Sequence, residues 1–194
     1  MLTFATALFF MIITPGPGVL TTAGVGSAFG YRPGLIFLTG LFIGTNLVAL
    51  AVVSGLAAIV FSVPVLRTVL LVASAAYLLY LAFRIATAGA QIRFIEKARP
   101  PGLMGGIALQ AINPKAYAVN TTLFTGFPFW PDNLFIETLI KFAIMNAVWI
   151  PVHLVWLWAG VGLKRLDLPD NVQFAINIGM AVAMVLVVAL AILP

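Results

Sequence analysis

The chain has 194 residues, of which 63% are hydrophobic and 8% charged, and its mean hydropathy is +1.16. So few polar side chains cannot cover a soluble globule, and the composition therefore indicates an integral membrane protein. The formal charge of +5 comes from basic residues scattered between apolar runs, which argues against the basic face of a nucleic-acid-binding protein. Cysteine is absent and there is one histidine, so we expect no thiol chemistry, no metal centre and no cofactor.

Six apolar segments follow one another along the chain, each long enough to cross a membrane as a helix of about 20 residues. They cover residues 2–29, 35–63, 68–90, 103–127, 142–163 and 172–193. This pattern predicts an all-α protein with one membrane domain, residues 1–194. A secretory signal peptide is the alternative for residues 1–30, but the basic region that such a peptide needs is missing, since the first basic residue is Arg32.

Basic residues gather in alternate connections between these segments. Connections 1, 3 and 5 carry Arg32; Arg84, Arg93, Lys97 and Arg99; and Lys164 and Arg165, whereas connections 2 and 4 carry Arg67 and Lys141. Under the positive-inside rule, we expect connections 1, 3 and 5 in the cytoplasm and both termini outside it.

Helix-breaking residues interrupt the first and fourth segments. The breaks are Thr14-Pro15-Gly16-Pro17-Gly18, within ITPGPG, and Asn113-Pro114-Lys115, within QAINPKAYAV. Each break is followed by the rest of its segment, a turn and an apolar segment with one asparagine. Asn46 lies 31 positions after Pro15, and Asn146 lies 32 positions after Pro114. The pattern predicts two three-helix repeats, about residues 1–92 and 101–194. Three is an odd number, so the copies would be inverted in the membrane, as in many secondary transporters.

Two simpler interpretations of the prolines stay open. Proline occurs in membrane helices as a kink with only a packing role. Alternatively, Asn113 is an ordinary N-cap and the fourth helix simply begins at Pro114. Residues 115–127 would then span on the order of 20 Å, which is short of a hydrocarbon core of about 30 Å.

Half-helices that begin at these breaks would present unpaired N–H groups and a positive dipole end at mid-depth. The preceding half-helices would end in free carbonyl groups. Carbonyl and N–H groups presented together match a zwitterion. Because irregular backbone at this depth is tolerated only in protein or beside a water-filled cavity, the breaks imply a cavity.

Two titratable side chains lie deep in their segments. Lys115 is roughly a dozen residues from either end of its segment, where an ammonium group without a partner costs several kcal/mol. We therefore favour a functional role for Lys115 over snorkelling to the interface. His153, in WIPVHLVW, is either a structural group or a proton carrier.

Other polar and small residues allow more than one interpretation. The amides of Asn46, Asn120, Asn146 and Gln110 suit a pocket or contacts between helices. The spacings Gly26-x-x-x-Gly30 and Gly40-x-x-x-Gly44 allow helices to approach closely, within one chain or in a homodimer. The aromatic run VWIPVHLVWLW is predicted to face lipid in the interfacial belt.

Four motifs together resemble the lysine exporter (LysE) superfamily, and within it the RhtB-type homoserine/threonine efflux family: TPGPGVL, GYRPGL, AAYLLYLAFR and QAINPKAYAV. The resemblance covers nearly the whole chain. It implies export of amino acids or their derivatives across the bacterial inner membrane by proton antiport, and no enzymatic activity. The family's motif residues correspond to Pro15, Gly16, Pro17, Asn113, Pro114 and Lys115.

One position departs from the pattern of this family, because Gly18 stands where Asp or Asn usually follows PGP. The missing side chain leaves the substrate and the coupling open, with Lys115 and His153 as the candidates for proton exchange. The predicted substrate-binding residues are Thr14, Pro15, Gly16, Pro17, Gly18, Asn46, Asn113, Pro114, Lys115 and Asn146. The alternatives are an uncoupled small-solute channel or facilitator and a non-transport membrane assembly subunit. A membrane-embedded enzyme lacks support, since there are no paired carboxylates and no nucleophile–histidine pattern.

Overall fold

The computed structural model describes residues 1–14, 16–87, 99–166 and 169–192. Within these ranges the chain forms nine α-helices and no strand. The helices are α1 (Leu2–Ile13), α2 (Pro17–Phe29), α3 (Tyr31–Val53), α4 (Leu56–Ser62), α5 (Pro64–Ala86), α6 (Gly102–Ile112), α7 (Pro114–Gly126), α8 (Leu134–Arg165) and α9 (Asp170–Ile192).

Both predicted breaks are confirmed. Helices α1 and α2 form an apolar pair bent by 51°, and α2 begins at Pro17, whose missing N–H suits the first turn of a helix. Asn113 alone separates α6 from α7, and its side chain accepts a hydrogen bond from the backbone N–H of Lys115 at 3.1 Å. Asn113 is therefore an N-cap, but of a half-helix that continues a preceding one. Pro15 lies outside the described residues.

The second segment differs from its prediction at both ends. Helix α3 begins at Tyr31, directly after Gly30 with its φ of 87°, so most of GYRPG is the first turn of a helix. The helix stops at Val53, and α4 follows Gly55, whose φ of 77° belongs to the left-handed region that ends helices. The prediction of one continuous segment over residues 35–63 was therefore wrong.

The fifth segment begins earlier than predicted, at Leu134, and Lys141 belongs to α8 instead of a connection. Lys141 forms a salt bridge of 2.7 Å with Glu137, one helical turn away, and both side chains are buried. The charge of Lys141 led to the prediction that it lies in a connection. A lysine and a glutamate four residues apart can instead pair with each other on one face of a helix. Helix α5 likewise begins at Pro64 instead of residue 68, and α9 begins at Asp170 instead of residue 172.

By length and composition, three of the described helices could cross a membrane alone: α3, α5 and most of α8. The bent pair of α1 and α2 would make a fourth span. Helix α6 and the stretch Phe174–Ala183 of α9 are apolar but shorter. The protein is thus an all-helical membrane protein over its described residues, and the arrangement of six spans in two inverted repeats stays a prediction.

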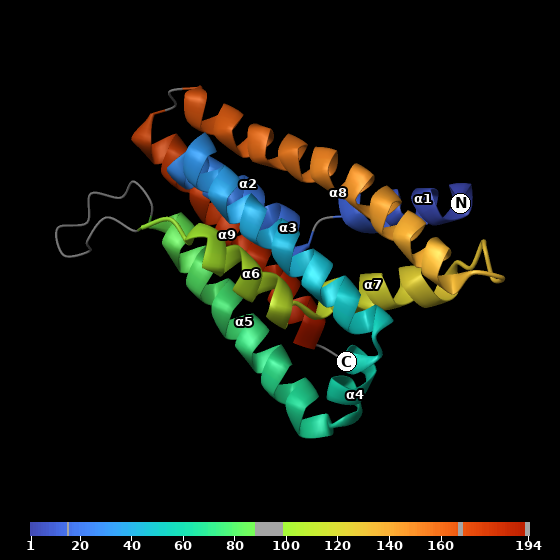
Figure 1. Ribbon diagram of the computed structural model, residues 1–194. Helices are drawn as coiled ribbons and strands as arrows, with labels where there is room; N and C mark the ends of the chain where they lie inside the picture. Colours follow the sequence, from blue (N-terminus) through green and yellow to red (C-terminus); the bar gives the residue numbers. More distant parts are fainter. Residues whose placement is uncertain (15, 88–98, 167–168, 193–194) are drawn as a thin grey trace.

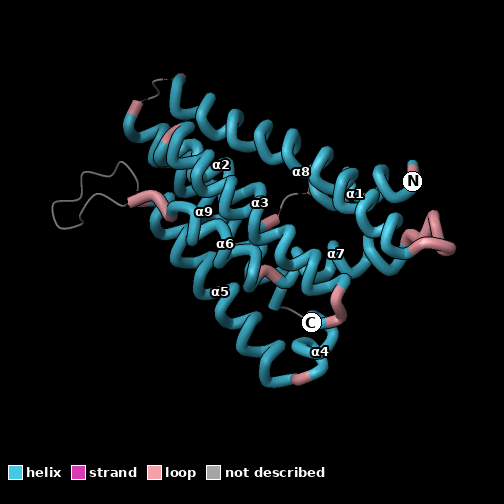
Figure 2. The backbone as a smooth tube through the Cα atoms, in the orientation of Figure 1, coloured by secondary structure: helices cyan, strands magenta, loops and turns pink. Residues whose placement is uncertain are grey.

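The helix ends that border connections 1, 3 and 5 gather at one end of the bundle (Figure 1). Here α2 leads into α3, α5 ends near the start of α6, and α8 ends near the start of α9. Helices α1 and α7 lie toward the opposite end, where α4 and the turn after α7 are also found (Figures 1 and 2). The described helix ends beside connections 1, 3 and 5 therefore share one end of the bundle, and their sidedness in a membrane stays a prediction.

In the half of the bundle that contains α2 and α6, helices cross at very short distances, α2 against α8 and α6 against α3. A Cβ atom on Gly160 of α8 would lie 2.8 Å from the carbonyl carbon of Ala23 in α2. A Cβ atom on Gly106 of α6 would lie 2.6 Å from the backbone nitrogen of Leu41 in α3. Both positions therefore require glycine. Gly40 also packs on α6, so its spacing motif serves contacts within one chain.

Large side chains pack in both halves, and they include Phe37, Leu109 and Leu157 beside these crossings. Where α1, α7 and the first part of α8 meet, the contacts are made by large side chains. Phe4 and Leu8 of α1, Leu123 of α7 and Met145 of α8 form a buried cluster there. Such side chains can change rotamers, whereas backbone-to-backbone crossings cannot rearrange without separating the helices. The site described next lies between these two halves.

Candidate functional site

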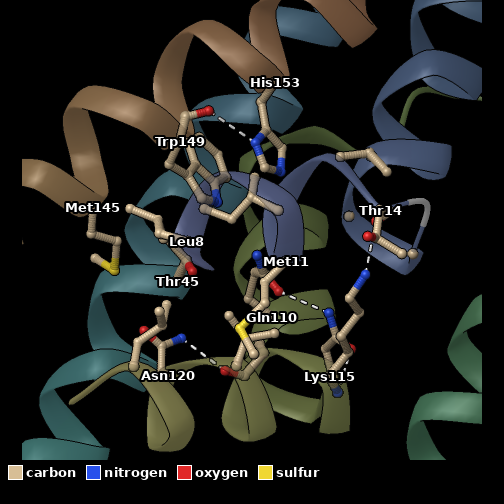
Figure 3. A pocket seen from close by; sticks show the side chains of 18 residues that line it. Leu8, Met11, Thr14, Thr45, Gln110, Lys115, Asn120, Met145, Trp149 and His153 are labelled. Atoms are coloured by element: carbon tan, nitrogen blue, oxygen red, sulfur yellow. Dashed lines mark hydrogen bonds between the residues drawn. The ribbon is translucent and has the colours of Figure 1, made fainter. Parts of the chain in front are cut away.

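The two breaks meet through Lys115. Its Nζ atom donates a hydrogen bond of 2.8 Å to the carbonyl oxygen of Thr14, the residue that ends α1. Figure 3 shows this side chain reaching from α7 toward Thr14. The last carbonyls of a helix carry the negative end of its dipole, so the ammonium group of Lys115 has a favourable partner there. This contact joins two segments that are far apart in sequence.

A network of amides surrounds the base of Lys115. The Nδ2 atom of Asn113 donates to Oε1 of Gln110 at 3.0 Å, and both residues are buried. Oδ1 of Asn113 is occupied by the backbone N–H of Lys115. These bonds fix the orientation of the Gln110 amide, whose Nε2 group can then donate to a different partner.

His153 enters the site from α8 and is held by Trp149, one turn earlier. Its Nδ1 atom lies 3.0 Å from the carbonyl oxygen of Trp149, and the two rings stack at 3.7 Å with an interplanar angle of 15°. A carbonyl oxygen only accepts hydrogen bonds, so Nδ1 carries the hydrogen and Nε2 has the lone pair. Trp149 was predicted to face lipid, which was wrong: it is buried in the core, while Trp158 of the same run is exposed.

A cavity of about 60 Å³ lies among these groups. Residues of α1, α2, α3, α6, α7 and α8 line it. The lining consists of Leu8, Met11, Ile12, Thr14, Gly16, Gly18, Val19, Thr45, Gln110, Asn113, Lys115, Ala116, Val119, Asn120, Leu123, Met145, Trp149 and His153. Polar groups from both breaks thus share one space with apolar side chains, mainly of α1, α7 and α8.

Asn120 presents an acceptor without a donor. Its Nδ2 atom donates to the carbonyl oxygen of Ala116 at 2.8 Å, which fixes the orientation of the amide. Its buried Oδ1 atom has no hydrogen-bond partner among the described residues. An unsatisfied buried acceptor costs about 1–3 kcal/mol, so this oxygen is suited to receive a donor from a bound molecule.

The predicted site residues divide into two groups. Thr14, Gly16, Gly18, Asn113, Lys115 and His153 line the cavity, together with the amides of Gln110 and Asn120. Pro17, Pro114, Asn46 and Asn146 do not appear in its lining. The first two shape the half-helices as their initial residues.

Asn46 and Asn146 bind each other instead of facing the cavity. The amide nitrogen of Asn46 donates to Oδ1 of Asn146 at 3.1 Å, and the reverse bond is 3.0 Å long. The pair joins α3 to α8. This is the arrangement expected of an interhelical contact, and any contact of these residues with substrate stays a prediction.

Sequence reasoning missed Thr45, Trp149 and the two methionines Met11 and Met145. Thr45 and Met145 stand directly before Asn46 and Asn146, the only polar residues next to any of the four, and neither neighbour lines the cavity. Among the described residues, no three histidine, cysteine or acidic side chains lie together in a way that could hold a metal ion.

Comparison with known proteins agrees with the motifs. Residues 9–193 match the LysE type translocator family. A stretch of 79 residues is 33% identical to the leucine efflux protein of Enterobacter sp. (strain 638), covering 41% of this chain and 37% of that protein. Over 131 residues the chain is 29% identical to the leucine efflux protein of Klebsiella pneumoniae subsp. pneumoniae, covering 65% of this chain and 62% of that protein.

These alignments span less than two thirds of either relative. No solved structure matches the chain. The family match, in contrast, extends over nearly every described helix and includes both breaks. The chain therefore belongs to the LysE type translocator family, whose members are membrane transporters and not enzymes.

Proposed function

We propose that this protein exports amino acids from the bacterial cytoplasm and binds them in the cavity between its two broken helices. The observation that carries the proposal is the hydrogen bond from Lys115 to Thr14, which joins both breaks beside that cavity. Transporters with broken helices place substrate where half-helix ends meet, because these ends supply unpaired N–H and carbonyl groups.

The lining favours an amino acid with an apolar side chain. Lys115 and the N-terminal ends of α2 and α7 suit the carboxylate, since a helix N-terminus attracts negative charge. Leu8, Met11, Leu123 and Met145 offer apolar contacts to a side chain. Two relatives are named leucine efflux proteins, and leucine has a side chain of this kind.

Binding requires the cavity to widen. A volume of about 60 Å³ holds a few water molecules, whereas small-molecule sites usually measure about 300–1,000 Å³. Methionine side chains adapt readily to new shapes, so Met11 and Met145 are the natural residues to move. We expect the α1 and α7 half to open, because close crossings hold the α2 and α6 half.

Proton antiport supplies the driving force in this proposal. Of the described residues that line the cavity, Lys115 and His153 are the ones that titrate. Connections 1, 3 and 5 face the cytoplasm, which places both termini on the periplasmic side. A homodimer is not part of the proposal, because Gly26 and Gly40 pack against helices of their own chain.

Efflux measurements test the proposal. Cells or proteoliposomes loaded with a panel of amino acids should release apolar ones, leucine among them, faster with the native protein than without it. Lys115→Ala should abolish most of this difference. Flux that persists unchanged after the proton gradient is collapsed would indicate a facilitator instead of an antiporter, and no flux of any amino acid would refute the proposal.

A further inference from the structure

Gly18 leaves an opening between two polar groups of the cavity. A Cβ atom on Gly18 would lie 3.6 Å from Nε2 of His153 and 3.9 Å from Nε2 of Gln110. Both side chains are 4% exposed, and no described residue hydrogen-bonds to either nitrogen. The opening is therefore bordered by an unused acceptor and an unused donor.

The chemistry of the two nitrogens is fixed by their other bonds. Trp149 holds the hydrogen of His153 on Nδ1, so Nε2 can only accept. Asn113 holds Oε1 of Gln110, so the amide nitrogen of Gln110 remains to donate. One side of the opening thus suits an ammonium group and the other a carboxylate, which are the two charged groups of an amino acid.

We propose that Nε2 of His153 binds the ammonium group of the exported amino acid in the space beside Gly18, and that the same lone pair carries the proton in exchange. This inference rests on the proposed function. The nitrogen has one lone pair, so it holds either a hydrogen from the ammonium group or a proton from water. Binding of one displaces the other, and the substrate keeps all of its own hydrogens.

Lys115 is the one charged side chain among the described residues that line this cavity, and it enters from α7. Helices α1 and α2 have no titratable side chain, and α3 has only Tyr31 and Arg32, in its first turn. Lys115 already donates to Thr14 and has no lone pair while it is charged. It therefore suits the carboxylate, whereas His153 suits the ammonium group.

The test uses purified protein in proteoliposomes with radiolabelled leucine. Two quantities are measured: leucine–leucine exchange without a pH gradient, and the stimulation of leucine flux by an imposed pH gradient. His153→Gln keeps an acceptor but does not titrate, so the ratio of its leucine flux with the pH gradient to its own flux without the gradient should fall to about one. His153→Leu removes the acceptor and should raise the KM for leucine by about tenfold or more.

Gly18→Ala tests the opening itself. Its methyl group would meet His153 and Gln110 at ordinary contact distances, so the helix should fold while leucine binds about tenfold more weakly. Gly162→Ala is the matched control, because no atom of the described residues lies within 4 Å of its Cβ position. Competition by 4-methylpentanoate, which lacks the ammonium group, should be unaffected by His153→Leu.

The outcomes separate the two proposals. If the native protein carries leucine and His153→Gln still responds to the pH gradient, the exchange role of His153 is wrong while amino-acid export stands. If His153→Leu has the same KM for leucine as the native protein, the ammonium group does not bind at His153, while amino-acid export stands. If the native protein moves no amino acid, the proposed function fails and this inference fails with it.

Discussion

Lys115 and Thr14 stand in different broken helices, and the Nζ atom of one lies 2.8 Å from the carbonyl oxygen of the other. The bond closes the C-terminal end of α1 with a charge from the first turn of α7. Hydrogen bonds to charged groups contribute about 1.5–3 kcal/mol, enough to bias the relative position of two half-helices. Lys115 thus links the two breaks directly, and under the proposed function it is also the residue through which substrate would act on both.

Gly16→Ala should disturb this bond without changing the backbone. Gly16 has an extended conformation, with φ of −160°, that any residue adopts. A Cβ atom there would lie 2.8 Å from both Cδ and Nζ of Lys115, so the lysine must move. We expect amino-acid efflux to fall by about tenfold or more, and Gly16→Ala combined with Lys115→Met to be no worse than Lys115→Met alone. If the double variant loses as much efflux as the two single variants together, Gly16→Ala does not act through Lys115.

Gly160→Ala should destabilise the protein, because its methyl group would overlap the backbone of Ala23. Overpacking of this kind costs about 1–3 kcal/mol. Gly162→Ala, in the same helix, would meet no described atom within 4 Å and should be neutral or slightly stabilising. Thermal unfolding in detergent measures the difference, and equal melting temperatures for the two variants would show that the α2–α8 crossing tolerates separation.

Lys141→Met should be strongly destabilising. Lys141 is 2% exposed, bridges to Glu137 and donates to the carbonyl oxygen of Phe124 at 3.0 Å. Glu137 also accepts from the backbone N–H groups of Phe129 and Trp130. Removal of one partner from a buried pair costs about 3–5 kcal/mol.

The double variant Glu137→Gln with Lys141→Met should recover much of the stability lost by Lys141→Met, since it leaves no uncompensated charge. Denaturation of the single and double variants by heat in the same detergent provides the comparison. A double variant less stable than Lys141→Met would mean that the carboxylate of Glu137 stabilises the turn after α7 without help from Lys141.

Asn46→Leu and Asn146→Leu test whether the asparagine pair is structural. Hydrogen bonds between membrane helices contribute on average about 0.6 kcal/mol, so each variant should lose a similar amount of stability. Because the two residues bond to each other, the double variant should lose less than the sum of the two single losses. The KM for amino-acid efflux should stay native in all three, and a large increase would instead support contact with substrate.

Local rules predicted much of the fold, because proline, glycine and long apolar runs act within a few residues. The breaks at Pro17 and Pro114 follow from the missing N–H of proline, and the family resemblance follows from the same motifs. The errors arose where a local signal had a second meaning. Gly55 ends α3 although it stands within an apolar run. Lys141 was assigned to a connection because of its charge, but its salt bridge with Glu137 lets it lie inside a helix.

The sequence by itself determined that the chain is helical and apolar, that two helices are interrupted, and that Lys115 and His153 stand deep within apolar segments. Only the tertiary structure decided that the breaks meet, that Trp149 turns inward to orient His153, and that Asn46 pairs with Asn146 away from the cavity. In a membrane protein the lipid-facing and protein-facing sides of a helix are both apolar, so hydrophobic periodicity does not reveal which side is buried. The packing of the helices settles that question.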